Sequence, residues 1–261
     1  MVAQQFDAAR ELENAVHVLA ARWTLALPTA IASLLIAAIV FFLIGAVIIS
    51  GVAAALIGHG AAAIAAIEAG ATSVAIAIGT IALISTLAHS MVMAAAHDAW
   101  AGRDPDYSAA FRLTLNRFPA LLVVAFIIAL LYAIPVALSF VLIGIPLLFV
   151  LGYFLMYARA AIVIGGEDAV TAIGTSFRLA STQTGPSLVA FAGIVAAFII
   201  GRIVDATTIH IPGLGLLTAF FVGGATAAYI ALVEVRFYEI LRNAPVPGAT
   251  APGAPTSTQL R

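Results

Sequence analysis

The sequence contains no cysteine and no lysine, and it has few charged residues of either sign. Without cysteine the chain forms no disulfide bond and no thiolate metal site, and the redox compartment stays open. Charged residues make up 9% of the 261 residues, against about 25% in soluble domains. All eleven basic residues are arginine and the net charge is −1, so a basic surface for nucleic acid is not expected. The charges are too few to cover a soluble protein of this size.

Long apolar runs take the place of charge. Hydrophobic residues make up 64% of the chain, and the mean hydropathy is +1.16. A membrane-spanning helix needs roughly 20 mainly apolar residues, whereas a membrane β-strand needs about 10 in alternating pattern. The sequence therefore predicts an all-α, polytopic membrane bundle of six transmembrane helices. The six runs are residues 25–50, 70–96, 119–142, 145–165, 187–204 and 213–233.

The remaining segments divide the chain into three parts. Residues 1–24 are predicted to form an amphipathic cytoplasmic helix. They carry Asp7, Glu11 and Glu13 before any apolar run and lack the basic start of a cleaved signal peptide, so the first run is expected to stay as a membrane anchor. Residues 25–242 form the membrane domain. Residues 243–261 are rich in Pro, Ala, Gly and Thr, which predicts a disordered cytoplasmic tail. The connection at 51–69 is either two helices that continue until they meet, through a turn at Gly58-His59-Gly60, or a re-entrant or surface segment.

The arginines predict the orientation. Ten of the eleven lie on one side of the six runs, and only Arg202 lies toward the other. When the distant Arg261 is left out, nine arginines lie on the first side and one lies on the other. Positively charged residues near the spans favour the cytoplasmic side. We therefore expect a multi-pass protein of the plasma membrane with both termini in the cytoplasm.

Three amphipathic stretches lie on the predicted cytoplasmic side. Apolar residues recur in them at helical spacing, which predicts helices that lie in the plane of the interface. Each precedes a pair of runs, so the chain resembles three units of one interfacial helix and one transmembrane hairpin. The apolar stripes are Leu12, Val16, Leu19 and Trp23; Tyr107, Phe111, Leu115 and Phe118; and Val170, Ile173 and Phe177.

Two stretches carry a resemblance to a known family. They are Tyr157–Leu179, YARAAIVIGGEDAVTAIGTSFRL, and Thr226–Tyr238, TAAYIALVEVRFY. Both resemble the six-helix membrane domain of some bacterial glycerophosphoryl diester phosphodiesterases, a domain that also occurs in stand-alone bacterial membrane proteins of unknown function. The resemblance covers about residues 22–242 and implies a six-helix topology in a bacterial inner membrane. The phosphodiesterases carry a catalytic barrel of roughly 250 residues after this domain, whereas this sequence ends within about twenty residues of the membrane domain, so the resemblance implies a topology and leaves the biochemical role open.

Polar residues near the end of the second run are candidate metal or proton sites. His89 and His97 are eight residues apart, a rotation of about 80° on a helix, so they do not stack with Asp98 around one metal. Compact ligand spacings such as HExxH are absent from the sequence. A structural role is favoured, and neither a metal ion nor a cofactor is expected. Glu68 is expected to be solvated, and no residue is predicted to be catalytic.

Charged residues within the runs are the other candidates. Arg159 lies about seven residues inside the end of the fourth run, and Glu234 or Glu239, at the inner end of the sixth run, is its expected partner. An Arg159–Glu234 pair would join two helices, while a gate or ligand contact is the alternative. Arg202 and Asp205, three residues apart, predict a local ion pair near the outer surface. For Arg202 the alternative is a substrate carboxylate or phosphate.

Small residues recur every four positions on the last two runs. Such stripes allow close approach of membrane helices, so these runs are predicted to pack as a tight hairpin. The stripes are Gly193, Ala197 and Gly201, then Ala219, Gly223, Ala227 and Ala231.

The function suggested first by these features is non-enzymatic. The protein would be a membrane scaffold or accessory protein whose interfacial helices contact lipid or a partner. A small transporter or channel, or a lipid-handling protein, is the alternative, and an intramembrane enzyme acting on lipids is the third hypothesis. Apolar mid-membrane zones argue against ion transport. The expected partners are membrane lipids, with another membrane protein or a second copy of the chain as further candidates, and no nucleic acid.

Overall fold

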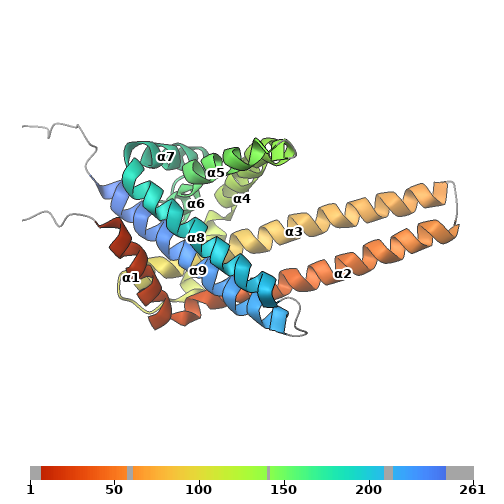
Figure 1. Cartoon of the computed structure of the whole chain (residues 1–261), viewed down its shortest axis with the longest axis horizontal. Coiled ribbons are helices and arrows are strands. Elements are labelled where there is room, and N and C mark those ends of the chain that lie inside the picture. The colour runs from red at the N-terminus through yellow and green to blue at the C-terminus, as the bar shows by residue number, and fades with distance from the viewer. Residues whose placement is uncertain (1–6, 58–60, 140–141, 209–213, 245–261) are drawn as a thin grey trace, which may run out of the picture.

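The computed structural model describes residues 7–57, 61–139, 142–208 and 214–244 of the chain. All regular elements within these ranges are helices, and six are long and apolar enough to cross a membrane. The predicted all-α, multi-pass membrane protein is therefore confirmed (Figure 1). The predicted turn at 58–60 and the predicted disordered tail after residue 244 lie outside the described residues.

The chain forms nine α-helices and one short 3-10 helix within the described ranges. Five long helices and the broken pair α5–α6 supply the six candidate spans, while α1 and α7 are short helices beside the bundle. In chain order the elements are α1 (Ala8–Ala21), η1 (Trp23–Ala26), α2 (Leu27–Ile57), α3 (Ala61–Trp100), α4 (Tyr107–Leu138), α5 (Gly144–Leu155), α6 (Ala158–Val163), α7 (Ala169–Thr182), α8 (Thr184–Thr208) and α9 (Leu214–Asn243).

Both short helices lie at one end of the bundle. Figure 1 places α1, α7 and the C-terminal end of α9 at this end, which also holds most of the arginines and is called the arginine-rich end below. Helix α1 packs on α8 and α9, with Ala15 fully buried, whereas Val16 and Trp23 of its predicted stripe are exposed. The face of α1 that packs is therefore centred on Ala15 rather than on Val16.

The hairpin of α2 and α3 is the longest feature of the molecule. Its helices have 31 and 40 residues, which correspond to about 46 and 60 Å at 1.5 Å per residue. A hydrocarbon core is about 30 Å thick. Figure 1 shows the hairpin extending well past the ends of α4, α5, α8 and α9. Residues 51–57 and 61–69 are helical. This agrees with the expectation that the two helices continue beyond the spans, and not with a re-entrant or surface segment.

The amphipathic stretch before the third run is not a separate interfacial helix. It forms the first turns of α4, which begins at Tyr107 and runs through Pro119 and Pro135. Asp106 caps the helix by accepting hydrogen bonds from the backbone N–H groups of Ser108 and Ala109. Tyr107 packs against the core, so the first turn of α4 belongs to the packed body.

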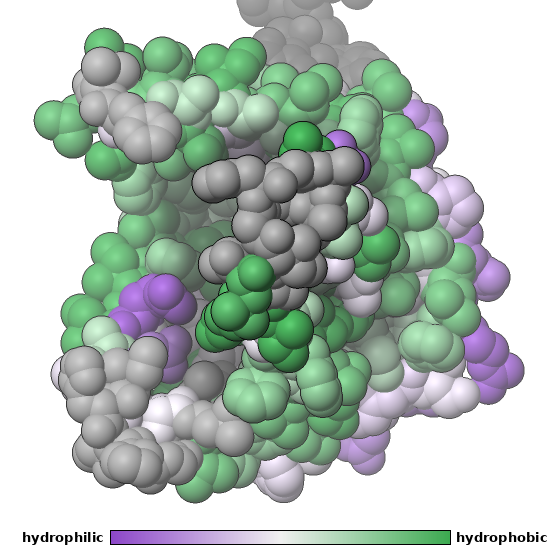
Figure 2. All heavy atoms as spheres, turned by 90° about the vertical axis from the view of Figure 1, so that its right-hand side faces the viewer, coloured by the Kyte–Doolittle hydropathy of each residue, from purple (hydrophilic) through white to green (hydrophobic). Residues whose placement is uncertain are grey.

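The well-packed core lies in the half of the bundle next to the arginine-rich end. Its fully buried side chains come from the ends of α3 and α9 and from the segment around α6, including Met93, Tyr157, Ile162 and Phe237. Large apolar side chains of the hairpin are exposed instead, such as Phe41. Figure 2 looks onto the opposite end, where the described surface is mainly hydrophobic. Polar side chains in the packed half are thus held in fixed positions.

Candidate functional site

A polar seam joins α3 to α9 inside the packed half of the bundle. Nε2 of His89 on α3 lies 3.0 Å from Oε2 of Glu234 on α9. Glu234 is only 8% exposed, and about 14 Å of helix separates it from the end of α9. A carboxylate buried at this depth is costly without a partner. His89 provides that partner.

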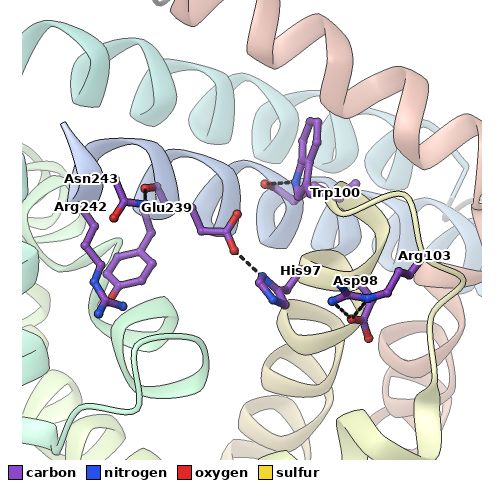
Figure 3. Close-up of polar contacts among 9 residues, drawn as sticks. His97, Asp98, Trp100, Arg103, Glu239, Arg242 and Asn243 are labelled. Carbon is purple, nitrogen blue, oxygen red and sulfur yellow. Dashed lines mark hydrogen bonds and ion pairs between the residues drawn. The ribbon is translucent and has the colours of Figure 1, made fainter.

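The seam continues to the arginine-rich end, as Figure 3 shows. The ring of His97 points toward Glu239 of α9, and Nδ1 forms a hydrogen bond with its carboxylate. Asp98 turns instead to Arg103, whose Nε and Nη2 lie 3.1 and 2.5 Å from Oδ1. His89, His97 and Asp98 therefore have three different partners. The described part of the chain holds no cluster of three His, Asp or Glu residues suited to a metal ion.

Trp100 fixes the last turn of α3. Its indole N–H donates to the carbonyl of Leu232 at 3.0 Å. The guanidinium of Arg236 lies 4.8 Å from the centre of the Trp100 ring, a cation–π contact. The same guanidinium donates to Glu11 of α1 at 2.8 Å. These contacts tie α1 to the ends of α3 and α9.

A break in the fourth span positions Arg159. Helix α5 ends at Leu155 and α6 begins at Ala158. The buried hydroxyl of Ser176, from α7, accepts a hydrogen bond from the N–H of Tyr157 at 3.1 Å and donates to the carbonyl of Phe154 at 2.7 Å. Backbone groups freed inside a membrane protein need such partners. Ser176 thereby stabilises the break that places Arg159 in the first turn of α6.

The structure does not form the predicted Arg159–Glu234 pair. Glu234 binds His89, and Glu239 binds His97. Among the described residues, Arg159 forms no hydrogen bond or ion pair. The sequence predicted the wrong partner for Glu234. Both His89 of α3 and Arg159 of α6 were available, and the rotation of these helices in the fold determines which of the two side chains contacts the carboxylate. Arg159 is thus a cation inside the membrane domain that no described carboxylate neutralises.

Arg159 lines two cavities. The first has a volume of about 330 Å³ and lies among α4, α5, α6, α8 and α9, with Tyr132 and Glu234 beside Arg159 on an otherwise apolar wall. A Cβ on Gly152 would stand 3.2 Å from the Tyr132 hydroxyl, so this glycine keeps the cavity open. The second cavity has about 240 Å³ and lies against α2 and α3. We call the two cavities that share Arg159 the chamber.

Hydroxyl groups and one imidazole line the second cavity. Ser33 contributes from α2, while Ser85, Thr86 and His89 contribute from α3. In the sequence these residues are scattered through apolar runs, and the mid-membrane zones therefore suggested no polar site. The helical fold brings them together around Arg159.

The other charged candidates lie outside the chamber. Nη1 of Arg202 lies 3.8 Å from Oδ2 of Asp205, as the local ion pair predicted. The Arg202 side chain is 70% exposed, and Oδ1 of Asp205 is buried without a hydrogen-bond partner in the described structure. Glu68 is exposed on α3. Neither position shares a wall with Arg159.

The small residues of α8 have different neighbours. A Cβ on Gly201 would lie 2.7 Å from Oγ1 of Thr226 on α9, so this glycine permits the close α8–α9 contact that the sequence predicts. A Cβ on Gly193 would lie 2.8 Å from Leu12 of α1, and this glycine seats α1 instead. Ala197 is half-buried.

The two glycines of α9 in this stripe region, Gly223 and Gly224, lie nearest to α2 rather than to α8. A Cβ on Gly224 would lie 2.8 Å from the Cβ of Ala30, whereas one on Gly223 would meet only Ser33, at 4.0 Å. Gly223 therefore does not contact α8. The close approach between α9 and α2 is at Gly224, which the four-residue spacing did not select. Ala227 lines the second cavity and Ala231 is buried. The side chain of Ala219 lies outside the described structure.

Sequence reasoning missed Tyr132, Ser176 and the groups around Arg159. Tyr132 lies on α4, and Ser176 lies on α7 within the stretch that carries the family resemblance. A single signal pointed to them, namely that an arginine inside an apolar run needs polar neighbours. Which helices supply those neighbours depends on the tertiary packing.

Comparisons of the chain with protein-family models, with curated proteins and with solved structures found no match. The resemblance to the six-helix domain stays a prediction. The geometry of the site therefore carries the functional argument.

Proposed function

We propose that the protein is a lipid-handling protein or small transporter that admits an anionic ligand to the chamber around Arg159. One observation carries the proposal: Arg159 lines both cavities and has no carboxylate partner among the described residues. An arginine within a membrane segment is costly unless it is paired or reaches water. A bound anion would offset that cost.

The charges around the chamber favour an anion over a cation. Glu234 is the acidic side chain on its walls, and His89 lies 3.0 Å from it. The Glu234 carboxylate is therefore bound to His89, and the guanidinium of Arg159 has no ion-pair partner among the described residues. Tyr132 adds a hydroxyl donor on the first cavity wall. A phosphate or carboxylate fits this donor set.

The scaffold hypothesis has weaker support in the geometry. It expected interfacial helices that contact lipid or a partner, and α1 buries Ala15 against the body and is held by Glu11 through Arg236. Its exposed Val16 and Trp23 suit the lipid interface. A chamber with an unpaired arginine has no role in a passive scaffold, whereas transporters place polar sites beside broken helices.

The distribution of arginine supports a cytoplasmic location for the arginine-rich end. On this proposal both termini lie in the cytoplasm and the α2–α3 hairpin points outward. The resemblance to the bacterial six-helix domain supports an inner-membrane location. The chamber would then lie closer to the cytoplasmic leaflet.

Cysteine labelling tests whether the chamber admits solutes, and the chain offers a background without native cysteine. Ile128→Cys and Ser33→Cys place a thiol on the first and second cavity walls. Val92→Cys is fully buried and Phe126→Cys is 71% exposed on α4, so these two serve as controls. Each variant is reconstituted in liposomes and treated with a charged, membrane-impermeant methanethiosulfonate.

We expect the two chamber thiols to react at least tenfold faster than both controls, because a thiolate forms readily only where water enters. Equal, slow reaction at all four positions would describe a closed interior. That result would reject the proposed function and favour the scaffold.

A further inference from the structure

An apolar groove adjoins the chamber. It has a volume of about 510 Å³ and lies between the first turns of α2, the last turns of α3 and the start of α4. Its walls are almost wholly apolar, and they include Leu27, Ile31, Leu87, Met91 and Phe111. The volume falls within the roughly 300–1,000 Å³ of ligand sites. The groove lies in the half of the bundle next to the arginine-rich end.

Two alanines connect the groove to the chamber. Ala32 of α2 and Ala88 of α3 line both the groove and the second cavity, and Arg159 lines the second cavity as well. Two small side chains therefore lie where an apolar space adjoins a space that contains a cation. This arrangement matches an amphiphile, with its chain in the groove and its charged group in the chamber.

The groove holds one polar group. The hydroxyl of Tyr107 is buried there and has no hydrogen-bond partner among the described residues. A buried hydroxyl without a hydrogen-bond partner is destabilising. On rotation of this side chain toward the groove, an ester carbonyl of a lipid would accept from it, which a bare hydrocarbon could not do.

We propose that an anionic glycerolipid, taken from the surrounding bilayer, binds with an acyl chain in this groove and its phosphate at Arg159. The inference rests on the proposed function and names the ligand class for its chamber. The positive charge of Arg159 selects an anionic headgroup, and the groove selects a lipid over a free anion. Ala32 and Ala88 line the place where the two parts adjoin.

Native mass spectrometry of the full chain tests the lipid. The protein is reconstituted in vesicles of equal parts phosphatidylglycerol and phosphatidylethanolamine, extracted in mild detergent, and the retained lipid is counted. We expect one phosphatidylglycerol per chain, retained at least tenfold above phosphatidylethanolamine. Arg159→Gln should remove this preference. Arg178→Gln, which deletes the same charge at an exposed position on α7, should leave it intact.

Two further variants separate a binding defect from a folding defect. Arg159→Lys keeps the charge and should retain most of the preference. Ala88→Leu places a larger side chain where the groove and the second cavity adjoin, leaves Arg159 intact and should lower retention several-fold. All variants are compared at an unchanged elution volume and melting temperature. Equal retention of both lipids by the unaltered protein, or unchanged retention in Ala88→Leu, would overturn the proposal.

A second arm distinguishes a lipid from a free anion. The delipidated protein is titrated with inorganic phosphate and with glycerol 3-phosphate, and thermal stabilisation is measured. We expect stabilisation by phosphatidylglycerol micelles at concentrations at least a hundredfold below those of either soluble anion. Equal potency of the soluble anions would overturn the lipid assignment, although the chamber thiols could still react as the proposed function requires.

Discussion

At the scale of single residues, adjacent positions in the same helix have different consequences. Gly223 and Gly224 both lie within α9, and a sequence pattern of small residues every four positions selects only Gly223. In the structure, Gly224 has close neighbours on α2 and Gly223 does not. The contact of α9 with α2 therefore depends on Gly224.

Replacement of each glycine by alanine makes a matched pair. Both changes favour the helix by about 1 kcal/mol in intrinsic propensity. At Gly224 the new Cβ would stand 2.8 Å from Ala30 Cβ and 2.9 Å from the carbonyl oxygen of Ala26, and overpacking of this kind costs about 1–3 kcal/mol. We expect Gly224→Ala to lower the melting temperature in detergent and Gly223→Ala to leave it unchanged or raise it. A lower value for Gly223→Ala alone would refute the assignment.

At the scale of elements, three helices begin where the sequence supplies an aspartate cap. Asp7, Asp106 and Asp168 each accept two backbone N–H bonds at the start of α1, α4 and α7. Such a cap is local information that a sequence carries by itself. The break between α5 and α6 has no proline to mark it. It depends on Ser176 from another helix, so it was not predicted.

The cap of α7 has a testable pH dependence. Hydrogen bonds from the hydroxyl and N–H of Thr171, and from the N–H of Val170, lower the pKa of Asp168 below its ordinary 3.8. Because the folded pKa is the lower one, the ionised carboxylate stabilises α7 fully above pH 3.8, and this contribution is lost as the pH falls through the lowered value.

The comparison is between the unaltered protein and Asp168→Asn, which keeps a capping oxygen but does not titrate. We expect the unaltered protein to be the more stable near neutral pH, with the difference disappearing in acid below the ordinary pKa. Thermal unfolding across this pH range measures it, and a carboxyl ¹³C titration of Asp168 gives the pKa directly. A midpoint above 3.8 would contradict the structure.

At the scale of the whole molecule, the number of spans could be predicted and the contacts between them could not. A span depends on the length and composition of one segment, which is local information. The partner of Glu234 depends on how α3, α6 and α9 rotate and cross, and the structure selects His89 over Arg159. The chamber and the groove arise from the same packing, so the sequence indicated an arginine in need of neighbours without identifying them.

Orientation is also a property of the whole molecule. Nine arginines near the spans lie on one side and one lies on the other, and an excess of positive charge favours the cytoplasmic side. Glu68→Cys on the hairpin and Arg178→Cys on α7 are both exposed and lie toward opposite ends of the bundle. In intact cells of a bacterial host we expect an impermeant thiol reagent to label Glu68→Cys at once, and Arg178→Cys only after the cells are opened. Labelling of Arg178→Cys in intact cells would invert the topology and place the chamber near the outer leaflet, where the lipid would have to enter from the opposite side.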